Sequence, residues 1–104
     1  MSIVHVLAII TTKPSQRAAV LEIFYANVPA VLAENGCIAY EATIDTPNAG
    51  TKQAAPGPDT FVVIEKWASL EALDAHAEAA HMKAYSGKTA DMLVERAIHI
   101  LSPA

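Results

Sequence analysis

Four side chains that could take part in chemistry follow one another closely between residues 65 and 81. Glu65 and Trp67 end an apolar stretch, His76 and His81 follow in an alanine-rich segment, and Trp67 is the only tryptophan. Imidazole can take up or release a proton near neutral pH, and a large flat indole ring stacks on aromatic ligands. The segment therefore predicts a pocket for a small aromatic molecule, with His76 and Trp67 as candidate catalytic residues.

Further polar and aromatic side chains are candidates for holding that molecule. By the two-residue period of a strand, Glu65 shares a face with Phe61 and Trp67. If it is buried, its carboxylate must be paired, hydrogen-bonded or protonated. Pairing with His5 or Arg96 from a neighbouring strand is one interpretation, and orientation of a catalytic imidazole is the other. The candidate substrate-binding residues are Glu65, His81, Tyr85, Phe61 and His5.

Each of the two catalytic candidates also has a purely structural interpretation. Trp67 could pack a helix onto the end of its strand, as large aromatic residues often do. A histidine on an alanine-rich helix could serve only as a hydrogen-bonding group. His81 and Tyr85 are four residues apart and can share a helix face, so with His76 they form a cluster of polar aromatic groups.

The spacing of the two histidines argues against a metal site. His76 and His81 are five residues apart, which is about 500° of rotation on a continuous helix, so they would not share a face. No cysteine, aspartate or glutamate stands at a supporting spacing. We predict no metal. The chain also contains no glycine-rich phosphate loop, nucleophile elbow or dinucleotide-binding signature, so no cofactor is expected.

The elements that position these residues can be predicted from the pattern of apolar residues. Strands are indicated by β-branched or alternating runs, and helices by apolar residues at steps of three and four. Ser15 and Ser69 are suitable N-cap residues. The predicted strands are residues 3–10, 37–45, 60–67 and 94–101; helices follow Ser15 and Ser69, with a second helical piece from about 81 to 92. Residues 46–59, rich in Pro, Gly and Ala, form a long loop that could control access to a site.

The order strand, helix, strand, strand, helix, strand is that of an α+β, ferredoxin-like βαββαβ fold with a four-stranded antiparallel sheet. Helices can cover only one face of such a sheet. The first strand is nevertheless apolar on both faces, with Leu7 and Ile9 on one and Val4 and Val6 on the other. We therefore expect a homodimer in which a second copy covers the free sheet face.

Length, charge and cysteine content narrow the class of protein. The 104 residues suffice for one domain, residues 1–104, and 53% of them are hydrophobic. The net charge is −4 without a basic run, which argues against nucleic acid and membrane partners. The one cysteine, Cys37, and the absence of a long apolar span predict a cytoplasmic protein.

Two groups of residues resemble a known family. The stretch from Asn35 to Glu41 and the pattern Phe61-x3-Glu65-x-Trp67, followed by His76 and His81, resemble the antibiotic biosynthesis monooxygenase domain, over nearly the whole chain. The similarity is greatest to small quinol-monooxygenase-like members. It implies a dimeric α/β barrel built from two ferredoxin-like units, and oxidation of a quinol or phenol by molecular oxygen without a cofactor.

Two alternatives to this activity stay open. One is a non-catalytic, small-molecule-binding or stress-related dimer. The other is a haem-binding or haem-degrading protein, because haem-degrading relatives have a similar fold. Those relatives use an asparagine on the first strand, where this chain has His5, so the haem alternative is the weaker one.

Overall fold

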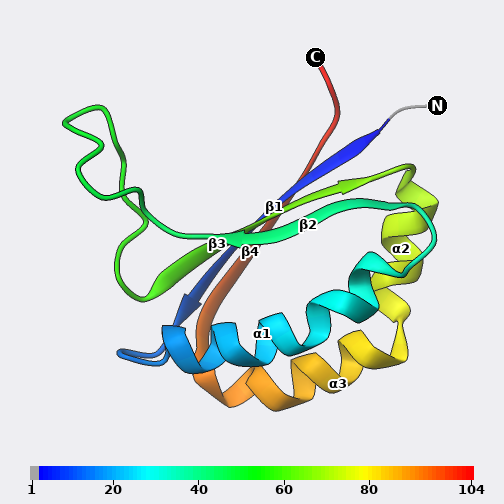
Figure 1. Cartoon of the computed structure of the whole chain (residues 1–104), viewed down its shortest axis with the longest axis horizontal. Helices are drawn as coiled ribbons and strands as arrows, with labels where there is room; N and C mark the ends of the chain where they lie inside the picture. Colours follow the sequence, from blue (N-terminus) through cyan, green and yellow to red (C-terminus); the bar gives the residue numbers. More distant parts are fainter. Residues whose placement is uncertain (1–2) are drawn as a thin grey trace.

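The computed structural model describes residues 3–104 as one antiparallel sheet with helices on one side (Figure 1). The strands are β1 (Val4–Thr12), β2 (Cys37–Thr43), β3 (Thr60–Trp67) and β4 (Leu93–Leu101). The helices are α1 (Arg17–Leu32), α2 (Leu70–Glu78) and α3 (Ala80–Thr89), and a 3₁₀ turn (Ala90–Met92) leads into β4. This is the predicted ferredoxin-like α+β fold.

The sheet has the order β2-β3-β1-β4 with every neighbouring pair antiparallel. Glu65 of β3 lies opposite Val6 of β1 on one side and opposite Tyr40 of β2 on the other. Directly opposed residues of antiparallel strands share a face. Glu65 therefore faces the helices together with Val6 and Tyr40, whereas His5 belongs to the other face.

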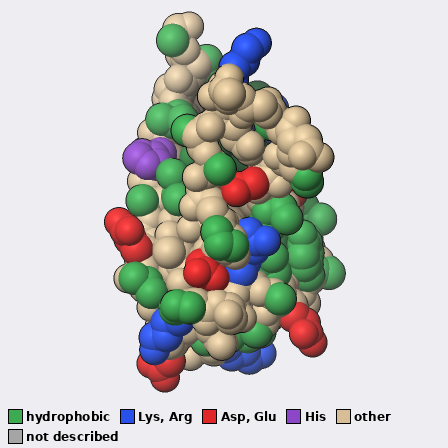
Figure 2. Space-filling model, turned by 90° about the vertical axis from the view of Figure 1, so that its left-hand side faces the viewer, with side chains coloured by type: hydrophobic (Ala, Val, Ile, Leu, Met, Phe, Trp, Pro, Cys, Tyr) green, Lys and Arg blue, Asp and Glu red, His purple; other side chains and the backbone are tan. Residues whose placement is uncertain are grey.

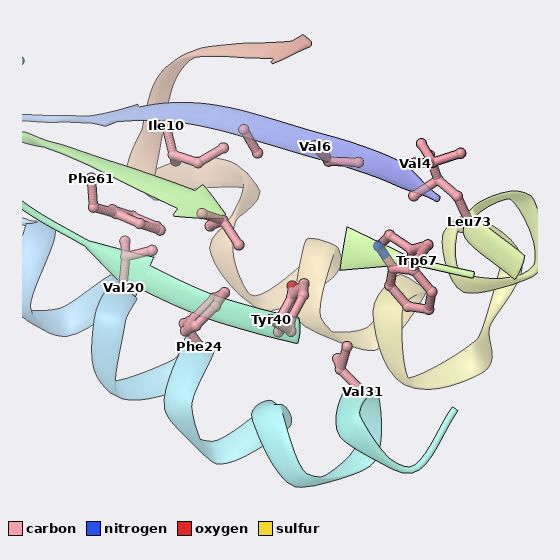
Figure 3. Close-up of a cluster of buried hydrophobic side chains, with 12 residues drawn as sticks. Val4, Val6, Ile10, Val20, Phe24, Val31, Tyr40, Phe61, Trp67 and Leu73 are labelled. Atoms are coloured by element: carbon pink, nitrogen blue, oxygen red, sulfur yellow. The ribbon is translucent and has the colours of Figure 1, made fainter. Parts of the chain in front are cut away.

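The core lies between the sheet and the helices, where alternate strand residues point (Figure 3). Aromatic rings occupy its centre: Phe24 of α1 stacks on Tyr40 at a centroid distance of 5.2 Å and meets Phe61 edge-on at 6.0 Å. Trp67 is 0% exposed, between the end of β3 and the helices. Burying such large rings is the main stabilising term for a core of this size.

The chain turns between α1 and β2 at a site where only glycine fits. Gly36 has a φ of +88°, and a Cβ there would lie 2.6 Å from the Cβ of Ala72 in α2. The backbone oxygen of Gly36 also accepts a hydrogen bond from Ala68 at 2.8 Å. The positive φ favours glycine, and the close approach fixes the turn, residues 33–36, against the start of α2.

The two predicted helix caps have different outcomes. Ser69 caps α2 as predicted, because its Oγ accepts a hydrogen bond from the backbone N–H of Ala72 at 3.1 Å. The prediction for Ser15 is wrong. Ser15 has a φ of +67° and its N–H donates to the carboxylate of Asp59, while Gln16 stands at the N-cap of α1 without a side-chain cap bond.

The second helical region is divided at Ala79. This residue has φ −62° and ψ 139°, an extended conformation that ends α2 and begins α3. The predicted second helical piece is therefore present, and the break at Ala79 changes the direction of the chain between His76 and His81.

The loop between β2 and β3, residues 44–59, projects away from the helices (Figure 1). Its base is fixed: both carboxylate oxygens of Asp45 accept from the N–H of Gly57, and Arg17 donates to the backbone oxygens of Gly57 and Thr60. Within residues 3–104, no helix has the length and apolar character needed to cross a membrane.

Candidate functional site

A cavity of about 260 Å³ lies between the sheet and the helices. Most of its wall is apolar, which is typical of a site for a small organic ligand. Its polar lining comes from strands and helices that are far apart in sequence. The lining includes Tyr40 of β2, Glu65 of β3, Asp74 and His76 of α2, Tyr85 and Ser86 of α3 and Arg96 of β4.

His76 is held at this cavity by a carboxylate that the sequence did not predict. Its Nδ1 lies 2.7 Å from Oε2 of Glu34, in the turn that follows α1. A carboxylate accepts hydrogen bonds, so Nδ1 carries the hydrogen and Nε2 is left with its lone pair when the ring is neutral. Within residues 3–104 no hydrogen bond is made by Nε2. The ring is thus arranged to accept a proton from a ligand.

The two tyrosines of the cavity cannot serve as bases near neutral pH. Burial, with a smaller contribution from the charge of Glu65, raises the pKa of Tyr40 far above its ordinary value. Burial also raises the pKa of Tyr85 to about 12, against the opposing charge of Arg96. Both phenols remain protonated and can donate a hydrogen bond to an oxygen of a ligand.

Glu65 is buried, and its carboxylate accepts a hydrogen bond from a neighbour on the same strand. Its Oε1 accepts the indole N–H of Trp67 at 2.9 Å, instead of the predicted partners His5 or Arg96. Burial raises the pKa of Glu65, while the Trp67 hydrogen bond and the nearby His76 lower it. Glu65 therefore contributes a polar oxygen to the cavity wall, but His76 is the better placed proton acceptor.

His81 lies beside the same carboxylate oxygen. Its Nε2 is 3.2 Å from Oε2 of Glu34, although the angles are not those of a hydrogen bond. The break at Ala79 brings both histidines to one oxygen of Glu34. The expectation that His76 and His81 would not face the same way, which assumed one continuous helix, is therefore wrong. His81 lines a second, outer groove of about 580 Å³ between α1 and α3, and Tyr85 lines both spaces.

Besides His81, three of the predicted site residues do not line the inner cavity. The Trp67 ring lines neither space; it packs behind His76, with the ring centroids 4.6 Å apart. Phe61 is buried in the core against Phe24. His5 lies on the opposite sheet face, because the register pairs Glu65 with Val6. Of the seven candidates, His76, Glu65 and Tyr85 line the cavity, and His81 reaches it only through Glu34.

One signal in the sequence could have indicated Glu34. It follows the end of α1, where the partial negative charge of the helix makes a carboxylate unfavourable. An acid in such a place needs a compensating partner, and here it has two imidazoles. Tyr40 was missed because its alternation in β2 shows only that it is buried, not what it faces. Within the described residues, no group of three metal-ligating side chains has a geometry suited to a metal ion.

The fold and this cavity define a ferredoxin-like α+β protein with a ligand-sized space beneath its sheet. Residues 3–88 match the family described as "Antibiotic biosynthesis monooxygenase". The chain belongs to this family. It is also 43% identical over 100 residues to "Probable quinol monooxygenase YgiN" of Escherichia coli K12, an alignment that covers 94% of this chain and 95% of the relative.

Solved structures share the same fold. PA3566 from Pseudomonas aeruginosa superposes with a TM-score of 0.81 at 24% identity, over 100% of this chain and 96% of its own. Rv0793 from Mycobacterium tuberculosis gives 0.80 at 25% identity, over 99% of this chain and 96% of its own. The βαββαβ arrangement predicted from the sequence is thus also found in experimentally determined proteins.

Proposed function

We propose that this protein is a monooxygenase that oxidises a small quinol or phenol with molecular oxygen and without a cofactor. The observation that carries the proposal is His76, with Nδ1 held by Glu34 at the wall of an apolar cavity. The family and the name of the YgiN relative support the same substrate class.

The mechanism begins with removal of the phenolic proton. A phenol has a pKa of about 10, so little of it is the electron-rich anion at neutral pH. Nε2 of His76 accepts the proton, and Glu34 stabilises the imidazolium that forms. The anion gives one electron to O₂, and the phenoxyl radical and superoxide combine at a ring carbon. Loss of water from the resulting peroxide yields a quinone, so that one quinol and one O₂ give one hydroxyquinone and one water.

The cavity limits the size of the substrate. Its volume of about 260 Å³ is below the range of about 300–1,000 Å³ that is usual for drug-sized ligands. We therefore propose a substrate with one ring or two fused rings. Tyr40 and Tyr85 would donate hydrogen bonds to its oxygen atoms, and the apolar wall would exclude water from the radical pair.

Oxygen consumption with a panel of one-ring and two-ring hydroquinones tests the proposal. We expect saturable uptake above the rate of spontaneous autoxidation, unaffected by chelators, with one O₂ consumed per quinol. Superoxide dismutase in every assay removes the contribution of free superoxide chains. Saturable quenching of Trp67 fluorescence by these compounds without oxygen uptake would instead indicate a binding protein, and a Soret shift with haem would favour the haem alternative.

We also propose a homodimer formed through the sheet face opposite the helices. By the strand register, this face carries Leu7, Ile9, Val62 and Ile64 together with polar residues such as His5 and Lys66. The helices of the described residues lie on the other face. Leu7, Ile9 and Val62 are half-buried, and Ile64 is 41% exposed. Figure 2 shows hydrophobic side chains gathered at the right-hand edge of its view. Apolar side chains grouped on an exposed sheet face are typical of a protein interface.

Sedimentation of the wild type and of Ile64→Glu tests this interface. We expect the wild type to have twice the chain mass of 11.0 kDa and Ile64→Glu to be a monomer, because a carboxylate at the centre of the patch would lose its hydration. Leu70→Glu is the matched control, since Leu70 is exposed at the start of α2. A wild type that sediments as a monomer at micromolar concentration would refute the homodimer.

A further inference from the structure

Glu34 occupies the point where two histidines from different helices meet. His76 comes from the last turn of α2 and His81 from the first turn of α3, and the extended Ala79 between them turns both rings toward one carboxylate. Oxygen Oε2 lies 2.7 Å from Nδ1 of His76 and 3.2 Å from Nε2 of His81. The backbone of Glu34 is fixed by hydrogen bonds to Val31 and from Cys37.

The two histidines face different spaces. His76 lines the inner cavity with Tyr40 and Glu65, whereas His81 lines the outer groove between α1 and α3. Glu34 therefore lies between the ring that would meet the substrate and a ring whose surroundings are close to solvent.

The two imidazoles are not equally well bound. His76 makes a full hydrogen bond to the carboxylate. Both ring nitrogens of His81 are buried, and within residues 3–104 neither has a hydrogen-bond partner. Buried unpaired nitrogens are unfavourable, and a protonated ring that turned slightly toward Oε2 would relieve one of them. His81 is therefore placed to compete for Glu34 when it gains a proton.

We propose that Glu34 is a positioning residue shared by the two histidines, and that the proton on His81 sets how readily His76 accepts a proton from the substrate. This inference rests on the proposed role of His76. With His81 neutral, the whole carboxylate charge stabilises the imidazolium of His76. With His81 charged, that stabilisation is divided and a like charge stands nearby, so proton acceptance by His76 becomes less favourable.

Other titratable and charged groups face this cluster, and the test must separate them from His81. The inner cavity around His76 is lined by Tyr40, Glu65, Asp74, Tyr85 and Arg96, and Cys37 lies nearby at the start of β2. The outer groove beside His81 is lined by Glu22 of α1 and Lys88 of α3. Burial and then the charge of Glu34 raise the pKa of Cys37, which places the thiol within electrostatic reach of the cluster. Of the groups named, His81 is the one that combines an imidazole with proximity to the same oxygen as His76.

The test compares two variants for which opposite effects are expected. Glu34→Gln removes the charge, so the acidic limb of the pH profile of kcat/KM should move to lower pH, and the plateau should fall because the base is weaker. His81→Gln removes the competitor, so the limb should move to higher pH by about one unit, a usual effect of a neighbouring charge. The matched control is Glu78→Gln, an exposed acid paired with Lys83, which should leave the profile unchanged.

A second readout does not depend on catalysis. The Cε1–H signal of His76 in the substrate-free protein, assigned with His76→Ala, should shift with pH, and its titration curve should move in the same two directions in the two variants. If the wild type consumes no oxygen, the proposed function fails while this titration still decides the inference. If Glu34→Gln does not fold, His81→Gln decides it alone.

Three results would overturn the inference. They are an unchanged His76 titration in His81→Gln, a movement of both variants in the same direction, and a shift that EDTA abolishes. The last result would assign the two imidazoles and the carboxylate to a metal ion instead of a shared proton.

Discussion

Replacement of His76 by alanine is expected to lower kcat/KM for oxygen uptake with a hydroquinone by about 10²- to 10⁴-fold. The reason is that His76 is the imidazole of the cavity wall, with Nδ1 held by Glu34 and Nε2 left to take the phenolic proton. Tyr40 and Tyr85 stay protonated, and Glu65 already accepts the indole N–H. The loss should be greatest near neutral pH and should shrink at alkaline pH, where the substrate ionises without help.

Free imidazole provides a control for this variant. The substitution leaves a space at the cavity wall into which imidazole can bind, so added imidazole should restore part of the rate. Full activity in His76→Ala would mean that the reaction needs no proton acceptor at this position.

Replacement of Trp67 by alanine is expected to lower the free energy of unfolding by about 3–5 kcal/mol, the usual range for a large aromatic residue in a core. Trp67 is 0% exposed, packs on His76 and is the hydrogen-bond donor to Glu65. Domains of this size are stable by only about 5–15 kcal/mol, so the variant should unfold at markedly lower urea. Circular dichroism at a fixed protein concentration measures the change without relying on the lost fluorophore.

Trp67→Phe separates packing from the hydrogen bond. It keeps an aromatic ring but leaves Glu65 without the N–H donor that favours its charged form. The pKa of Glu65 in the folded protein is already raised above its ordinary value of 4.5. Glu65 therefore contributes most to stability below pH 4.5, and this contribution is lost as the pH rises through the folded-state pKa. The destabilisation of Trp67→Phe relative to wild type should therefore grow between about pH 4 and neutral pH. Equal destabilisation across this pH range would show that the Trp67 hydrogen bond does not change the pKa of Glu65.

The sequence predicted the arrangement of the sheet and helices because local patterns determine it. Period-two alternation placed the strands, and Ser69 marked the start of α2. The apolar character of both faces of β1 is also present in the structure, where one face packs on the helices and the other stays partly exposed.

The site was predicted less well because its contacts join distant parts of the chain. Glu34 and His76 are 42 residues apart, and no spacing rule connects a turn after one helix to the end of another. The argument from helical rotation failed for His76 and His81 because Ala79 interrupts the helix between them. The position of His5 depended on the register of β1 against β3, which alternation alone does not determine.

The projecting loop, residues 44–59, has a consequence for how this chain can vary. Because Asp45, Gly57 and Arg17 close its base, the path of its tip has little influence on the strands that it joins. No residue of the loop lines the inner cavity. Insertions, deletions or a fused peptide at its tip should therefore be tolerated without disturbing the chemistry beneath the sheet. The loop gives evolution, or a protein engineer, a place to lengthen the chain that is separate from the part that reacts.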